Sequence, residues 1–80
     1  MVNPEQIEEW IKGGLACDHV EVAGDGHHFE AVIVSAAFRG KRPVQQHQLV
    51  YKALGERMRE EIHALSMQTY TPEDWRQAGH

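Results

Sequence analysis

Residues 38–71 constrain the fold more than any other part of the sequence, because they combine a turn, a long helical pattern and a strand in that order. Gly40 interrupts the chain, and Pro43 stands where proline is tolerated in the first turn of a helix. Six residues then fall on one arc of a helical wheel and predict the face that packs on a sheet: Val44, His47, Val50, Tyr51, Leu54 and Met58. Leu49 falls nearly opposite this arc, so we expect its side chain to be exposed, where a partner could dock.

The segments before and after this helix have the patterns of strands. Residues 19–22 alternate with a period of two, and the following Gly24-Asp25-Gly26 tolerates positive φ, so the chain is expected to reverse there. Residues 28–34 form the returning strand, and their run Ala31-Val32-Ile33-Val34 is apolar on both faces, which predicts a central position in the sheet. Residues 62–69 form the third strand, so strand, helix and strand together predict a βαβ unit.

Short helices are predicted at both ends of the chain. Asn3 followed by Pro4 is a typical helix start, and Gln6 is placed to complete a reciprocal cap. The same signal recurs at Thr71 and Pro72, which begin a short final helix. The expected fold is therefore α+β, in the order α-β-β-α-β with a short C-terminal helix and a three-stranded mixed sheet.

Length and composition limit the classes of protein to which the chain can belong. Residues 1–80 are expected to form a single domain, and the only cysteine, Cys17, excludes an internal disulfide framework and favours a reducing compartment. The sequence contains neither a signal peptide nor an apolar run of the roughly 20 residues that span a bilayer, so we expect a soluble, cytoplasmic protein without membrane contact. A net charge of −4 disfavours nucleic acid as a partner.

The geometry of the βαβ unit makes three histidines candidate metal ligands. A strand of eight residues advances about 26 Å and a helix of sixteen residues returns about 24 Å, so a parallel third strand would begin beside the second. His63 would then lie near His27 and His28, and three imidazoles at one rim would suit a first-row metal. An antiparallel third strand would separate them. The chain offers imidazoles but no nearby thiolate pair, so a partner would have to complete the coordination.

A structural role is the simpler interpretation for the other histidines. His47 lies on the apolar arc of the helix and is expected to be partly buried with a hydrogen-bonded ring. His19 is expected to be a solvated strand residue, and His80 a free terminus. For the pairing of His63 with His27 or His28, spacing alone leaves both a ligand role and a structural role open.

Several segments, in this order, resemble the BolA family and its short IbaG-like branch. They are Val20-Glu21-Val22, Gly24-Asp25-Gly26, His28-Phe29, Val32-Ile33-Val34-Ser35, Phe38-Arg39-Gly40-Lys41, Gln46-His47-Gln48-Leu49-Val50-Tyr51, Ile62-His63-Ala64-Leu65-Ser66-Met67 and Thr69-Tyr70-Thr71-Pro72-Glu73-Asp74-Trp75. The resemblance covers nearly the whole chain. It implies a fold similar to class II KH domains.

The resemblance also implies a partner and a cofactor. Members of the family pair with monothiol glutaredoxins and share a [2Fe–2S] cluster with them, with glutathione supplied through the glutaredoxin. The family's cluster histidine matches His63, and its second ligand comes from the loop between the first two strands. Only His27 or His28 could supply that ligand here, and His28 is slightly favoured because His28-Phe29 matches the family. Self-association as a homodimer is left open.

A nucleic-acid-binding regulator of transcription or stress response, including acid stress and morphology, is the alternative function. Arg39, Lys41 and Arg42 would face the phosphates, but the Gly-x-x-Gly clamp of true KH domains is absent, so binding is expected to be weak. We expect no enzymatic activity, since no nucleophile–base pair or oxyanion device is recognisable in the sequence.

Overall fold

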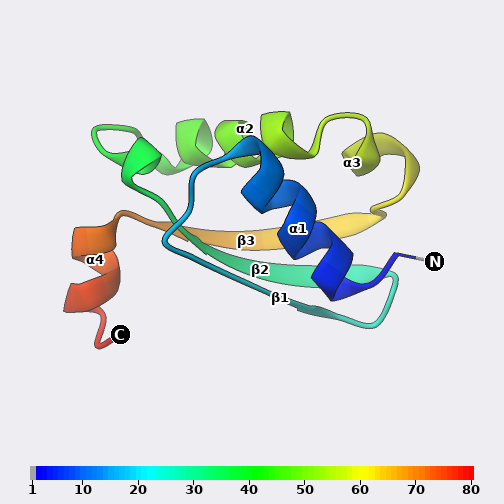
Figure 1. Cartoon of the computed structure of the whole chain (residues 1–80), viewed down its shortest axis with the longest axis horizontal. Coiled ribbons are helices and arrows are strands. Elements are labelled where there is room, and N and C mark those ends of the chain that lie inside the picture. Colours follow the sequence, from blue (N-terminus) through cyan, green and yellow to red (C-terminus); the bar gives the residue numbers. More distant parts are fainter. Residues whose placement is uncertain (1) are drawn as a thin grey trace.

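Three strands form one mixed sheet with β2 at its centre. The computed structural model describes residues 2–80. Its elements are α1 (Pro4–Gly14), β1 (His19–Gly24), β2 (His28–Val34), the 3₁₀ turn η1 (Ala36–Phe38), α2 (Pro43–Leu54), α3 (Arg57–Glu60), β3 (Ala64–Tyr70) and α4 (Pro72–Gln77). β2 pairs antiparallel with β1 and parallel with β3 (Figure 1). The predicted α+β fold, the mixed sheet and the central position of residues 28–34 are confirmed.

The helices begin where the capping residues predict. The Asn3 side chain accepts a hydrogen bond from the backbone N–H of Gln6, and the Gln6 side chain accepts one from Asn3, both at 2.9 Å. This reciprocal cap satisfies two groups that a free helix end leaves unpaired. At α4, the Thr71 hydroxyl accepts from the N–H of Asp74 at 3.1 Å. Within residues 2–80, no helix has the length and apolar character needed to cross a bilayer.

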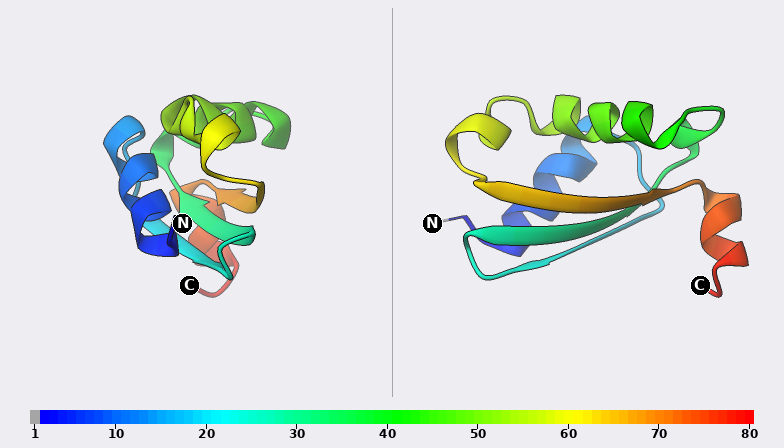
Figure 2. Two further views of the ribbon diagram at one scale, coloured as in Figure 1. Left: turned by 90° about the vertical axis from the view of Figure 1, so that its right-hand side faces the viewer. Right: turned by 180° about the vertical axis from the view of Figure 1, so that it is seen from behind.

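The core lies between one face of the sheet and the helices α1 and α2. Figure 2 shows the helices α1, α2 and α3 on this face, while α4 packs at one end of the opposite face, where Trp75 contacts His19 and Tyr70. The core residues alternate along the strands and recur at helical spacing in α1 and α2, as one-sided burial requires. They are Ile7, Ile11, Val20, Phe29, Ala31, Ile33, Phe38, Val50, Leu54 and Ile62.

The buried face of α2 shares Val50 and Leu54 with the predicted arc but is rotated about the helix axis relative to it. Val44 is 62% exposed and Tyr51 is 41% exposed, whereas Leu49, which the wheel places outside, is half-buried and packs against the core. The predicted positions of these three side chains were therefore wrong. Gln46 explains the rotation, because its side chain is buried between α2 and the sheet.

The Gln46 amide ties three separate segments together. Its nitrogen donates to the carbonyl oxygens of Phe38 at 3.2 Å and Lys41 at 3.0 Å, and its oxygen accepts from the Thr69 hydroxyl at 2.6 Å. A fully paired amide can be buried at little cost, so a polar residue takes a position that hydrophobic periodicity reserves for an apolar one. His47, one residue later, is half-buried as expected, but its ring makes no hydrogen bond within residues 2–80.

The long helix predicted from the sequence is interrupted. α2 ends at Leu54, because Gly55 adopts a positive φ of 58° and its N–H bonds to the Tyr51 carbonyl at 2.8 Å. A residue with a side chain would be strained in this conformation. The short helix α3 then completes the return of the chain, so that Ala64 pairs with His28. The predicted parallel pairing is correct although the predicted continuous helix is not.

Replacing Gln46 with leucine tests the role of the amide. Gln46→Leu leaves the Thr69 hydroxyl and two backbone carbonyls without their partner, so we expect unfolding to be easier by about 1–3 kcal/mol. Gln48→Leu is the matched control, since Gln48 is exposed on the same helix, and should change stability by less than about 0.5 kcal/mol. Urea denaturation followed by circular dichroism measures both, and equal stability of the two variants would contradict this account.

Candidate functional site

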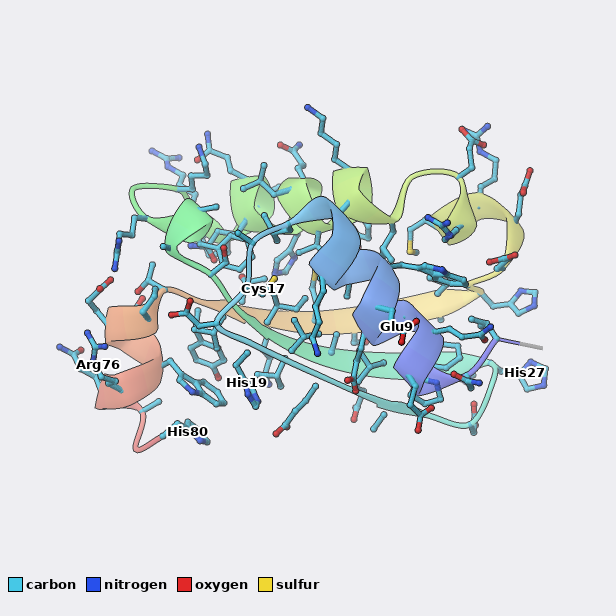
Figure 3. The ribbon with its side chains drawn as sticks, viewed as in Figure 1. Glu9, Cys17, His19, His27, Arg76 and His80 are labelled. Atoms are coloured by element: carbon cyan, nitrogen blue, oxygen red, sulfur yellow. The ribbon has the colours of Figure 1, made fainter. Side chains whose placement is uncertain are left out.

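The parallel register places two histidines side by side at the rim of the sheet. His28 pairs with Ala64, so the preceding residues, His27 and His63, lie at the same level. Their ring centroids are 6.0 Å apart, with the ring planes inclined by 33°. Both side chains are exposed, and Figure 3 shows His27 at the end of the molecule where β2 begins. The sequence-based expectation that His63 meets a loop histidine is thus met by His27.

The structure separates His28 from this pair. Consecutive strand residues point to opposite faces, and Phe29 is buried on the side of α1 and α2, so His28 projects toward the opposite face of the sheet. The register therefore favours His27 over His28 as the neighbour of His63. Two imidazoles meet where three were expected, and within residues 2–80 no three His, Cys, Asp or Glu side chains are grouped for a metal ion.

A tight turn fixes the backbone that carries His27. The Asp25 carboxylate accepts hydrogen bonds from the N–H groups of His27 and His28, both at 2.9 Å. These bonds, that from His28 first, lower the pKa of Asp25. Gly26 has a φ of 99°, and a Cβ at Gly24 would collide with the His28 carbonyl oxygen and the adjacent phenyl ring. The two glycines are therefore required by the turn itself.

His63 is positioned by the segment that precedes it. Ile62 is buried in the core, and its N–H donates to the carbonyl of Arg57 at 3.0 Å. The Arg57 guanidinium in turn lies 4.7 Å from the centroid of the Trp10 ring, a cation–π contact between α3 and α1. His63 thus follows an anchored residue and emerges at a defined point on the rim.

A shallow pocket of about 400 Å³ opens beside His63, between the first part of α1 and α3. Its lining residues come from two segments that are distant in sequence: Val2, Gln6, Trp10, Glu60, Glu61 and His63. This pocket was not predicted from the sequence. The adjacency of Glu60-Glu61 to Ile62-His63 was the one available signal, whereas the proximity of Trp10 depends on how α1 packs.

The histidines at the opposite end of the sheet surround Trp75. His19 stacks on the indole with ring centroids 5.1 Å apart, and His80 stacks on it at 3.7 Å. His19 Nε2 is 3.0 Å from a Glu21 carboxylate oxygen, but the geometry is not that of a hydrogen bond. His19 is therefore half-buried rather than fully solvated, and His80 is not the free terminus that the sequence suggested. Figure 3 shows both far from His27.

Cys17 is poorly suited to metal binding. Its side chain is half-buried, and its thiol donates to the Leu15 carbonyl at 3.3 Å. Burial, with a smaller contribution from Asp18, raises the pKa of the Cys17 thiol and so disfavours the thiolate that metals bind. Figure 3 places it far from the end that carries His27.

The three basic residues considered for nucleic-acid binding are not equally available. Arg39 forms a two-pronged pair with Glu73, in which Nε lies 2.9 Å from one carboxylate oxygen and Nη2 contacts the other. This pair raises the pKa of Arg39 and lowers the pKa of Glu73 to about 2. Lys41 and Arg42 are exposed and make no ion pair within residues 2–80.

Comparison with known proteins identifies a single family. The family model described as BolA-like protein matches residues 13–74. BolA-like protein 1 of Mus musculus is 38% identical over 95% of this chain and 53% of its own length. DNA-binding transcriptional regulator BolA of Haemophilus influenzae is 45% identical over 72% of this chain and 56% of its own. The chain thus spans about half the length of these curated relatives.

Solved structures of similar proteins share the fold. A bolA protein homologue from Coxiella burnetii is 47% identical, with a TM-score of 0.89, and the match covers 95% of this chain and 99% of that one. BolA1 from Mus musculus superimposes with a TM-score of 0.82 at 31% identity, over 96% of this chain and 71% of that one.

The Arg39–Glu73 pair makes a prediction about pH. Because the folded-state pKa of Glu73 is lowered, its contribution to stability is present above the ordinary glutamate pKa of about 4.3 and is lost as the pH falls toward about 2. Arg39→Ala should raise the Glu73 pKa toward the ordinary value, whereas the control Lys41→Ala should not. Carboxyl-carbon NMR titration measures this pKa, and a wild-type value near 4 would refute the prediction.

Proposed function

Because the chain belongs to the family of BolA-like proteins, we propose that it acts without catalysis as the partner of a monothiol glutaredoxin. In this role it co-ligates a shared [2Fe–2S] cluster in iron–sulfur trafficking or iron regulation. The exposed His27–His63 pair is the observation that carries the proposal. A site that stands at the rim of the domain can be reached by a second protein, whereas a buried one cannot.

The donor atoms of this pair fit a shared metal. Metal–nitrogen bonds of about 2.0–2.1 Å place two imidazole centroids that bind one ion roughly 5–6 Å apart. The observed 6.0 Å between His27 and His63 requires only a small adjustment of the two exposed rings. Both rings would serve as ligands of the cluster, and the glutaredoxin would complete the set of four with its cysteine and a glutathione thiolate.

The histidines of this chain would set the reduction potential of the shared cluster. Replacing thiolate ligands by histidine raises the reduction potential of a [2Fe–2S] centre, which suits regulation or transfer of the cluster. The turn at Asp25 holds the backbone of His27, and Ile62 holds that of His63. The imidazoles can therefore reorient while the backbone positions stay fixed.

Single histidine substitutions test the proposal. His63→Ala should leave the fold and docking to the glutaredoxin intact, because an exposed rim residue contributes little to the core, but the mixed-ligand spectrum should be lost or revert to that of an all-thiolate site. His27→Ala should alter the spectrum as well, while His28→Ala is the control and should not. Visible absorption and circular dichroism of each co-expressed complex report the ligands, and thermal melting reports the fold.

Two outcomes would contradict the proposal. One is a wild-type protein that forms no coloured complex with a monothiol glutaredoxin. The other is a His63→Ala complex whose cluster spectrum is unaltered. A spectrum that changes with His28→Ala and not with His27→Ala would leave the partnership intact but overturn the choice of loop residue.

Nucleic-acid binding is the second candidate function. The relative in Haemophilus influenzae bears the name DNA-binding transcriptional regulator, and Lys41 and Arg42 are free to contact phosphates. It ranks second because the chain has a net charge of −4 and Arg39 is engaged with Glu73. Two or three cations neutralise few phosphates, so both the affinity and its salt dependence should be small.

A salt titration measures how many phosphates are contacted. If Lys41 and Arg42, with or without Arg39, make the contacts, the slope of log K against log salt should be about −2 to −3 on duplex DNA. The slope should fall toward zero in Lys41→Ala/Arg42→Ala, with Lys12→Ala as a control for the loss of one positive charge elsewhere. Fluorescence anisotropy with a labelled duplex gives these values, and absence of binding at low salt would remove this candidate.

A further inference from the structure

The pocket beside His63 has the chemistry of a receptor for a cationic side chain. It lies in direct continuity with the candidate ligand, since His63 is one of its lining residues. Any protein that brings a metal to His63 must therefore approach the surface around this pocket. The chemistry of the pocket therefore limits which partner can bind there.

Two carboxylates dominate the charge of the pocket. Glu60 and Glu61 are exposed and make no ion pair within residues 2–80, whereas Glu56 and Glu73 each contact an arginine. In the part of the chain that the structure describes, no lysine or arginine lines the pocket. The guanidinium of Arg57, from the same helix α3, is directed at the Trp10 ring and lies 4.7 Å from its centroid.

The apolar wall of the pocket favours a side chain with a long aliphatic stem. Val2 and the half-buried Trp10 line the side that α1 contributes. Lysine and arginine lay their methylene stems along such surfaces while the charged end stays in a polar environment. Arg57 already places its guanidinium over the indole, so the structure itself contains one example of a cationic side chain on this ring.

We infer that this pocket receives a lysine or arginine side chain of the partner glutaredoxin as it approaches His63. The stem would contact Trp10 and Val2, and the charged group would pair with Glu60 and Glu61. The inference rests on the proposed function and adds to it a specific anchoring contact. Because the contact involves charge and lies apart from the metal, it should operate before any cluster is bound.

Affinity for the cluster-free glutaredoxin tests this contact separately from ligation. Glu60→Gln/Glu61→Gln should weaken the apo complex about three- to tenfold at low salt, and the difference from wild type should shrink as salt is raised. Glu60→Lys/Glu61→Lys should weaken it more than tenfold. Isothermal titration calorimetry measures these affinities, and thermal melting checks that the exposed substitutions leave the fold unchanged.

A matched variant controls for net charge. Glu21→Gln/Glu30→Gln removes the same two charges from the strands β1 and β2 and should leave the affinity within twofold of wild type. Equal weakening by both double variants, or wild-type affinity of Glu60→Gln/Glu61→Gln, would overturn the inference while leaving the proposed function standing. If the wild type binds the glutaredoxin neither apo nor cluster-loaded, the proposed function fails, and the inference fails with it.

A double-mutant cycle identifies the partner side chain. Each lysine and arginine of the glutaredoxin is replaced by alanine and measured against wild type and Glu60→Gln/Glu61→Gln. We expect one replacement to show a coupling of at least about threefold with the pocket variant. Additive effects for every lysine and arginine would refute the contact.

Discussion

The parallel pairing of β2 with β3 is the constraint on which the rest of the structure depends. Parallel strands cannot be joined by a hairpin, so the chain must cross back over the sheet, and the crossover supplies the helical layer that buries the core. The register pairs His28 with Ala64, and this alone sets His63 level with His27. A shift of one residue in either strand would reverse the faces of all its side chains and separate the two imidazoles.

Both ends of the crossover are held by local contacts rather than by helix length. At its beginning, Gln46 joins η1, the following turn and β3 through a single buried amide. At its end, Gly55 terminates α2, and Ile62 enters the core immediately before the candidate ligand. The crossover therefore delivers His63 to a fixed position, although it consists of two helices instead of one.

Charge is distributed unevenly between the two ends of the sheet. The end with the histidine pair carries the free carboxylates Glu60 and Glu61, whereas the end near α4 carries Lys41 and Arg42 and the closed Arg39–Glu73 pair. A partner that approaches the histidines meets an acidic, partly aromatic surface, and a polyanion would meet a small basic one at the other end. The two proposed functions would thus use opposite ends of the domain and need not compete for one surface.

The sequence by itself determined the order of the elements, the capped helix starts, the antiparallel turn and the mixed sheet, because periodicity and capping are local properties that neighbouring residues fix. It also placed His63 beside the β1–β2 loop. Only the tertiary structure decided which side of α2 is buried, since a wheel gives a mean direction and cannot foresee that a paired Gln46 is buried. Likewise, the fact that His27 rather than His28 lies beside His63 depends on strand register, and the acidic pocket depends on how α3 packs against α1 through Arg57 and Trp10. Both arise from contacts between segments distant in sequence, which no local pattern records.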